Sequence, residues 1–393
     1  MQEKSYLPVN WIDGMKINKS HFIAQDNAML YQVAQASSSL LNDLNYGLLP
    51  ADQNSNGLKL FLSTDNQQKV QVRIRECRAI TAGGYYIQFN EDTALSGNNL
   101  QTPLITPAIS LKDLKAKSAA YYIVLTINPY KRVPVGEADP AETPPRIPYA
   151  APLYSVDLVP VSEVAKNKLG GFQLPVGKIK IDDQRVQLDE EYIPPCCTVS
   201  SHQDLAEIHA ALEQFFAKME SYSLQIIQKI QQKKQVNDMA VIVQKLCDQV
   251  LFFTGTQVAE LKSLGLIQAP VYVISKICSL ARVFKNTLDC YLGSGKEELV
   301  NYFTEWCSFT KGDLESAIVT LSNHQYDHMD INSSVEKVSV FTIIISNLFH
   351  QLARLEYIGK RKEAGIFVKE EVISPSAQQP AQTDLDAYRR GYK

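Results

Sequence analysis

The sequence lacks the features that mark secreted and membrane-spanning chains. Its most apolar stretch, residues 338–349, is interrupted by serine, threonine and asparagine and is shorter than the roughly 20 apolar residues that a membrane span needs. The chain opens with Met1-Gln2-Glu3-Lys4, with no basic start followed by an apolar run, so no signal peptide is predicted. These absences together predict a cytoplasmic protein.

Excess charge of one sign and paired cysteines are also missing. The 39 basic and 42 acidic residues are mixed along the chain and give a formal net charge of -3, so no basic face for nucleic acid is predicted. The 7 cysteines include no CxxC pair and their number is odd. Reduced thiols that pack as small apolar groups are the simplest interpretation.

Motifs of catalysis are incomplete. Gly293-Ser294-Gly295-Lys296 resembles a phosphate loop, but the earlier glycine and the following serine or threonine are absent. His324 and His328 are four residues apart, which fits either a metal-binding pair or polar residues at a turn between helices. Cys196 and Cys197 precede a predicted helix and fit either a reactive thiol or packing residues. We predict no enzyme, no cofactor and no metal, with a metalloenzyme as an alternative.

What the first half does contain is strands. Several runs are rich in β-branched and aromatic residues, and Val70, Val72 and Ile74 alternate with polar residues as in a half-buried strand. A helix capped by Asn18 or Ser20 precedes them, with Phe22, Met29, Val33, Ala36, Leu40 and Leu44 near one face. The predicted strands are 58–62, 70–80, 84–89, 121–128, 153–159, 172–181 and 185–188.

A proline-rich stretch lies between two of these strands. Residues 129–152 contain seven prolines in 24 residues, which predicts neither regular strand nor helix. A contact loop and a disordered surface excursion are both compatible with this composition.

The second half is helical, and the change of character lies near residue 200. Apolar residues recur there at alternating steps of three and four, a period that keeps one stripe facing a partner helix in a bundle or an oligomer. The first stripe is Leu205, Ile208, Leu212, Phe215, Met219, Tyr222 and Ile226, and the second runs from Val338 to Leu355. Further helices are predicted at 237–264, 270–292, 297–309 and 314–323.

The order of elements predicts an α+β fold. We expect an antiparallel β-sandwich with an N-terminal helix over residues 1–198 and an α-helical bundle over residues 199–365. Residues 366–393 are polar and contain Pro375 and Pro380, so we expect a tail there, with one possible strand at 366–373.

Two segments resemble the TssK family of the type VI secretion baseplate. The first is Val9-Asn10-Trp11-Ile12-Asp13-Gly14-Met15 followed by His21-Phe22, which is similar to the Trp-x-[Glu/Asp]-Gly-Met opening of that family. The second is Leu174-Pro175-Val176-Gly177 with the run Leu188-Asp189 to Tyr192-Ile193-Pro194-Pro195-Cys196. Together they cover the β-rich half from end to end, and the helical half agrees in kind.

The resemblance implies a structural role. TssK proteins form homotrimers built on a shell related to phage receptor-binding proteins, bind TssF and TssG through the shell, and dock on a membrane complex through a C-terminal head. A structural adaptor at the inner face of the inner membrane is therefore expected, with TssF- and TssG-like partners and a membrane-complex partner of unknown identity. A phage-tail-like protein that recognises an external ligand such as a glycan is the alternative.

One departure from the family pattern concerns the head. Only about 28 residues follow Gly365, so we expect the usual head to be absent or replaced by helices within 297–360. The candidate partner-binding residues are Trp11, Gly14, Met15, His21 and Phe22, for which filling the sandwich core is the alternative. The stripe Leu205 to Ile226 is the candidate seam of an oligomer or of a bundle.

Overall fold

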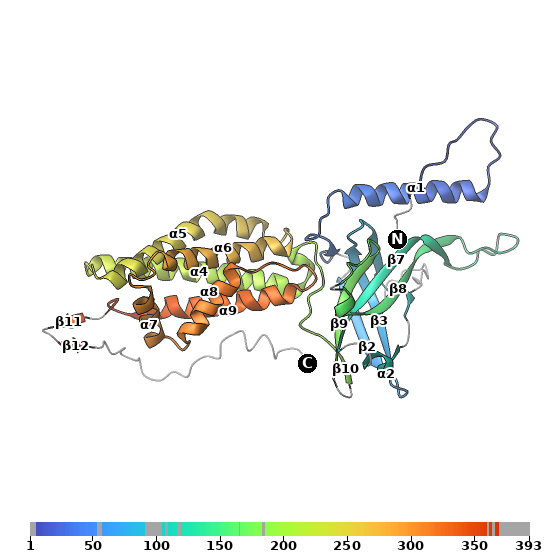
Figure 1. The fold of residues 1–393 in the computed structure, drawn as a ribbon. Helices are drawn as coiled ribbons and strands as arrows, with labels where there is room; N and C mark the ends of the chain where they lie inside the picture. Colours follow the sequence, from blue (N-terminus) through green and yellow to red (C-terminus); the bar gives the residue numbers. More distant parts are fainter. Residues whose placement is uncertain are drawn as a thin grey trace.

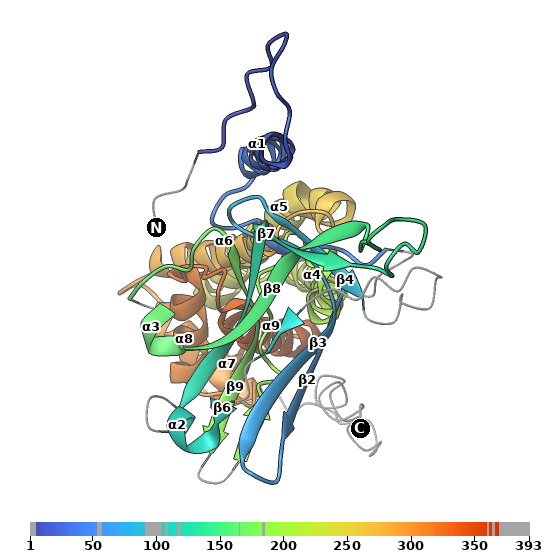
Figure 2. The same ribbon diagram turned by 90° about the vertical axis from the view of Figure 1, so that its right-hand side faces the viewer.

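The chain folds into a mixed α+β structure. The computed structural model describes residues 5–52, 57–90, 104–106, 109–115, 119–164, 166–182, 185–359, 361–363 and 366–368. Strands dominate the first half and long helices the second, and the two parts lie end to end (Figure 1). In the view along the long axis, helix α1 stands at the outer side of the strands (Figure 2). Within the described residues, no helix combines the length and apolar character that crossing a bilayer requires.

The first sheet is organised around one long strand, β3 (Lys69–Ile80). Every other strand of this sheet pairs with β3 in antiparallel register. Val70, Val72 and Ile74 are buried while Gln71 and Arg73 are exposed, so the predicted alternation is confirmed. The partners are β1 (Gly47–Leu48), β2 (Leu58–Thr64), β4 (Tyr86–Asn90) and β6 (Ile109–Ser110).

The second sheet has the order β10-β9-β7-β8-β5. Its pairs are antiparallel except for β5 with β8. A Cβ placed on Gly177 would lie 2.6 Å from the Leu60 side chain of the first sheet, so the two sheets contact each other there. The strands are β5 (Leu104–Ile105), β7 (Ala120–Val135), β8 (Tyr149–Pro160), β9 (Gln173–Asp182) and β10 (Arg185–Leu188).

The strand predictions are confirmed, but the proline-rich stretch was predicted wrongly. Strands β7 and β8 continue into it as a two-stranded ribbon, with Pro134 opposite Ala150 and Val135 opposite Tyr149. The register shifts between Asn128 and Arg132, where the Asn128 side chain accepts two backbone N–H bonds. A ribbon of two strands has an open side on each strand, where a proline without an N–H donor is tolerated.

The helical half begins after a short 3₁₀ turn at Val199–Ser201. Predicted helix starts are confirmed at Asn237, whose side chain accepts from the Ala240 N–H, and at Pro270, the first residue of its helix. The long helices are α4 (Gln203–Gln232), α5 (Asp238–Leu264), α6 (Pro270–Asp289), α7 (Lys296–Trp306), α8 (Lys311–Ser322) and α9 (Ile331–Arg354).

Shorter elements complete the described chain. Helix α1 spans Lys19–Ser38, and α2 (Leu111–Lys115) and α3 (Val161–Val164) are single turns beside the sheets. Strands β11 (Arg361–Glu363) and β12 (Ile366–Val368) form a small hairpin, so a strand begins at the predicted Ile366. The remainder of the predicted tail lies outside the described residues.

Candidate protein interface

The N-terminal motif forms a turn that leads into α1. Gly14 has a φ of 76°, a conformation that side chains with a Cβ rarely adopt, and the Met15 N–H bonds the Ile12 carbonyl at 3.3 Å. The turn brings the Trp11 ring within 6.1 Å of His21 and 6.2 Å of Phe22, measured between ring centroids. All five predicted partner-binding residues thus lie in or against this turn, and Gly14 provides its bend.

The start of α1 is fixed by its cap. The Asn18 side chain accepts from the Ser20 N–H at 2.9 Å, which confirms Asn18 as the capping residue. His21 Nδ1 accepts from the Asn18 N–H at 3.4 Å. This reciprocal capping holds the His21 ring, and hence the neighbouring Phe22, in a defined direction relative to Trp11.

One side of α1 rests on the β-rich part. Ala28 and Ala34 are buried, and a Cβ on Gly84 would lie 2.3 Å from the Ala34 carbonyl oxygen, so the β3–β4 turn needs glycine to approach the helix. Arg132 at the base of the ribbon bonds Asp26 at 2.8 Å and the Asn27 side chain at 3.1 Å. These contacts set the orientation of the helix.

The other side of α1 faces solvent with large apolar side chains. Phe22 is 57% exposed, Met29 56% and Val33 64%, and Leu40 just after the helix is 80% exposed. Trp11, at 46% exposure, adds to the same surface. We call Phe22, Met29, Val33, Ala36 and Leu40 the α1 stripe. We take these exposed apolar side chains as the candidate interface. Trp11 and Phe22 do not fill the core of this chain.

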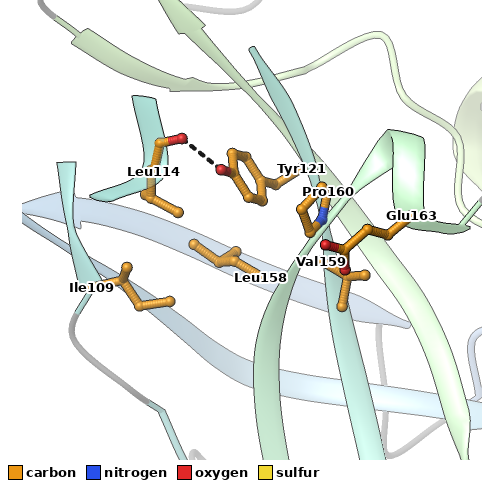
Figure 3. Close-up of a pocket in the computed structure, with 7 residues that line it drawn as sticks. All are labelled: Ile109, Leu114, Tyr121, Leu158, Val159, Pro160 and Glu163. Carbon is orange, nitrogen blue, oxygen red and sulfur yellow. Dashed lines mark hydrogen bonds between the residues drawn. The ribbon is translucent and has the colours of Figure 1, made fainter. Parts of the chain in front are cut away.

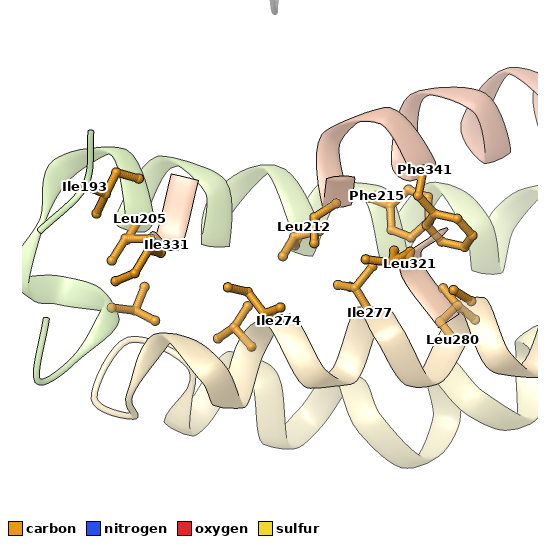
Figure 4. Packing of buried hydrophobic residues seen from close by; sticks show 14 of the residues in the cluster. Ile193, Leu205, Leu212, Phe215, Ile274, Ile277, Leu280, Leu321, Ile331 and Phe341 are labelled. Carbon is orange, nitrogen blue, oxygen red and sulfur yellow. The ribbon is translucent and has the colours of Figure 1, made fainter. Parts of the chain in front are cut away.

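The second predicted stripe has the opposite environment. Leu205, Leu212, Phe215, Met219 and Ile226 of α4 are buried, while Ile208 and Tyr222 are half-buried against the same core. Leu212 and Phe215 point toward residues of α6, α8 and α9 of the same chain, as Figure 4 shows. The stripe Leu205 to Ile226 therefore packs within one chain.

The junction of the two parts is held by backbone hydrogen bonds. The Leu48 N–H donates to the Pro195 carbonyl at 2.7 Å, and the Cys197 N–H donates to the Leu48 carbonyl at 2.9 Å. Gly47 has a φ of 121°, and a Cβ there would lie 1.9 Å from the Pro195 oxygen. Glycine is required at this position because the two backbones touch.

His328 connects the loop between α8 and α9 to Tyr46, the residue before β1. Its Nε2 lies 2.8 Å from the Tyr46 carbonyl and its Nδ1 lies 2.8 Å from the Tyr326 hydroxyl. Because a carbonyl only accepts, Nε2 carries the proton and Nδ1 accepts from Tyr326. Burial lowers the pKa of His328, which favours this neutral form. This contact could not be predicted from local sequence patterns, because Tyr46 and His328 are far apart in the chain.

The alternative of a metal site at His324 and His328 has no support in this geometry. Both ring nitrogens of His328 are engaged, and those of His324 lie 2.8 Å from Ser334 Oγ and 3.2 Å from Lys337 Nζ. Among the residues that the structure describes, no three His, Cys, Asp or Glu side chains are grouped as metal ligands.

The remaining chemical motifs have structural positions. Lys296 starts α7 and pairs with Asp289 at 2.6 Å, so the Gly293–Lys296 segment is a turn between helices. Cys196 is buried and its thiol contacts the Pro194 carbonyl at 3.1 Å. Burial raises the pKa of Cys196, and raises the pKa of Cys197 to about 12, so neither thiol forms a thiolate readily.

A pocket of about 190 Å³ lies beside the second sheet (Figure 3). Its one ionisable carboxylate is Glu163, and the hydroxyl of Tyr121 donates to the Leu114 carbonyl at 2.5 Å. No acid–base pair is present among the lining residues, which are Ile109, Leu114, Tyr121, Leu158, Val159, Pro160 and Glu163. The apolar surface of α1 is thus the stronger candidate site.

Comparison with known proteins gives one family match. One family model matches residues 156–246. Its description is “Bacterial Type VI secretion, VC_A0110, EvfL, ImpJ, VasE”. That segment runs from β8 through the junction into α5, and it includes the Leu174–Cys196 motif and α4. No curated protein sequence matches the chain.

Solved structures of TssK are similar to this chain at low identity. A crystal structure of TssK shares 13% identity with a TM-score of 0.48, covering 86% of this chain and 69% of that chain. In the TssK-TssF-TssG baseplate subcomplex of the type VI secretion system, the matching chain shares 13% identity with a TM-score of 0.41. The match covers 87% of this chain and 99% of that chain. In the baseplate complex from the type VI secretion system, the match has 12% identity and a TM-score of 0.49. It covers 88% of this chain and 100% of that chain.

Type VI secretion is common to the family model and to these neighbours. The family model covers the Leu174–Cys196 motif, so it supports the resemblance that was stated from that motif, whereas Trp11 lies outside the matched residues. The segment 156–246 of this chain is thus similar to a family of bacterial type VI secretion.

Proposed function

We propose that this protein is a structural adaptor: a homotrimer that joins a TssF- and TssG-like wedge to the cell-envelope complex. It would act on the cytoplasmic side, at the inner face of the inner membrane, with a membrane-complex protein at its far end. Residues 1–198 would be the shell-like sandwich and residues 199–365 the helical bundle. The match to a type VI secretion family supports this proposal.

The observation that carries the proposal is the exposed apolar surface at the N-terminus. An adaptor works through interfaces, and Trp11 and Phe22 present aromatic side chains that one chain leaves 46% and 57% exposed. Aromatic anchors of this kind dominate the binding energy of protein interfaces. We assign Trp11, Gly14, Met15, His21 and Phe22 to contacts with the wedge or with neighbouring protomers.

The α4 stripe has a different role in this proposal. We assign Leu205 to Ile226 to the core of the helical bundle within each protomer, because these side chains are buried against the chain's own helices. The hydrogen bonds of Leu48 with Pro195 and Cys197 would hold the bundle at a fixed angle to the sandwich. A rigid connection suits a protein that links two large assemblies.

Co-purification with the TssF- and TssG-like proteins of the same bacterium tests the proposal. We expect the wild-type chain to recover both partners, and Trp11→Ala to weaken recovery by roughly 30-fold, the effect of losing about 2 kcal/mol at a hot spot. Phe252→Ala is the matched control, because Phe252 is 71% exposed on the helical part. Failure of the wild-type chain to recover either partner would contradict the adaptor role.

A further inference from the structure

The loop between α8 and α9, residues 323–330, reaches the β-rich part at Tyr46. His328 Nε2 donates to the Tyr46 carbonyl at 2.8 Å, and the Tyr46 hydroxyl donates to Met329 Sδ at 3.3 Å. The rings of Tyr46 and His328 lie 5.0 Å apart between centroids. Tyr46 precedes β1, so these contacts attach the helical bundle to the first sheet at a point separate from the chain that links the two parts (Figure 1).

His328 cannot take a second proton without a loss at this contact. Its Nδ1 accepts from the Tyr326 hydroxyl at 2.8 Å, so the ring holds one proton, on Nε2. A proton on Nδ1 would turn this acceptor into a donor, and the Tyr326 hydroxyl would lose the acceptor for its own proton. Because His328 is 3% exposed, water would not solvate the imidazolium that results. The contact with Tyr46 therefore depends on the neutral form of the ring.

The acidic groups around His328 do not reverse this preference. Asp327 of the same loop and Asp43 of the segment before β1 raise the pKa of His328, but burial lowers it by more. The net effect is a pKa below the usual 6.5. The other titratable groups beside the contact are uncharged, because burial raises their pKa values, and they are Tyr46, Tyr192, Cys196 and Tyr326.

His324, at the start of the loop, has a similar arrangement. Lys337 Nζ of α9 lies 3.2 Å from Nδ1, and Ser334 Oγ lies 2.8 Å from Nε2. Because an ammonium group only donates, Nδ1 is the acceptor and Nε2 carries the proton. Burial and the charge of Lys337 both lower the pKa of His324. Arg282 of α6 binds the C-terminal end of α8 and adds positive charge on this side, and burial keeps the thiol of Cys278 uncharged by raising its pKa.

We propose that the loop between α8 and α9 is a proton-sensitive latch: with both histidines neutral it holds the bundle to the β-rich part, and protonation of the histidines releases it from Tyr46. The backbone hydrogen bonds of Leu48 with Pro195 and Cys197 contain no titratable group, so the two parts stay joined there when the loop opens. Release would let the bundle change its angle to the sheets, which adds regulation to the proposed function.

The direction of the pH dependence follows from the two lowered pKa values. The released loop binds up to two protons that the closed loop does not bind, so acid favours release. Below the usual pKa of 6.5, each histidine shifts the equilibrium toward the open loop by up to about tenfold per pH unit.

Hydrogen exchange of the full chain, followed by mass spectrometry and expressed as protection relative to the unfolded rate at each pH, tests the latch. Between pH 7.5 and 5.5 we expect protection of residues 44–48 and 323–330 to fall by roughly tenfold or more, while that of the α4 interior stays unchanged. His324→Gln with His328→Gln should keep its protection at pH 5.5, because a glutamine amide donates and accepts like a neutral imidazole but does not titrate. The matched control is His350→Gln on α9, an exposed histidine outside the loop, which should lose protection as the wild-type chain does.

Three results would overturn the proposal. They are equal protection of the wild-type loop at both pH values, a double glutamine variant that loses protection as the wild-type chain does, and an α4 interior that opens together with the loop, as in global acid unfolding. Lys337→Met keeps both histidines and covers the case in which the glutamine variant does not fold. Without the ammonium group His324 can take a proton in place, so this variant should lose less protection in acid than the wild-type chain, and an equal loss would contradict the latch. All of these measurements use the chain alone, so their outcome does not depend on the adaptor role.

Discussion

Helices α1 and α4 carry apolar stripes of similar spacing in opposite environments. Met219 and Leu212 of α4 are at most 3% exposed, while Met29 and Val33 of α1 are more than half exposed. Helix α4 is followed by long helices that fold back on it, whereas α1 is followed by strands that cover only its alanine side. A 3-4 pattern thus shows that a helix needs a partner, but not whether the partner belongs to the same chain.

Charged residues on the remaining surface distinguish α4 from α1. Helix α4 has charged residues on its outer side, such as Asp204, Lys218 and Glu220, all of which are exposed. Charge on one side and apolar residues on the other are typical of a helix at the edge of its own domain. Residues 27–42 have no charged residue, and the polar residues exposed there are uncharged, such as Gln32 and Gln35.

The largest expected effect comes from removing the α4 stripe. Leu212→Ala with Phe215→Ala should lower the free energy of unfolding by about 5 kcal/mol or more, because both side chains leave cavities in a close-packed core. Urea denaturation followed by circular dichroism measures the loss. Unchanged stability would show that the α4 stripe is not part of the core and would remove the contrast with α1.

The junction gives the next largest effect and tests whether α4 depends on the β-rich part. Gly47→Ala should cost about 3 kcal/mol or more, because a left-handed backbone and a direct contact with the Pro195 oxygen both exclude a Cβ. Gly14→Ala is a matched control, since its φ is also positive but nothing lies within 4 Å of an added Cβ. Equal losses in the two variants would show that backbone strain alone, and not the junction contact, determines the cost.

The sequence predicted local structure far better than contacts between distant segments. Strands β2, β3 and β10, the cap at Asn18 and the helix that starts at Asn237 follow from neighbouring residues, and their predictions are confirmed. The pairing across the proline-rich ribbon could not be predicted, because it depends on register rather than on propensity. The contacts of Gly47 with Pro195 and of His328 with Tyr46 join distant segments, and only the folded chain brings them together.

A smaller effect on the same half of the molecule is expected from acid. Burial lowers the pKa of His328 below its usual 6.5, so below about pH 6.5 the unfolded chain binds a proton that the folded chain does not. Stability should therefore fall as the pH falls below about 6.5, by up to about 1.4 kcal/mol per pH unit for this group. His328→Gln, measured by urea denaturation between pH 7.5 and 5.5, should show a shallower loss than the wild-type chain. An unchanged slope would mean that His328 does not contribute to it.

The smallest effect on folding should come from the α1 stripe. Met29→Ala with Val33→Ala should change the free energy of unfolding of the dissociated chain by no more than about 0.5 kcal/mol per site, because exposed side chains lose little contact on truncation. The measurement requires dilution until wild-type and variant chains are both monomeric, since association stabilises the folded state by mass action. A loss comparable to that of Leu212→Ala with Phe215→Ala in the dilute chain would place the α1 stripe in the protomer's own core and end the contrast between the two helices.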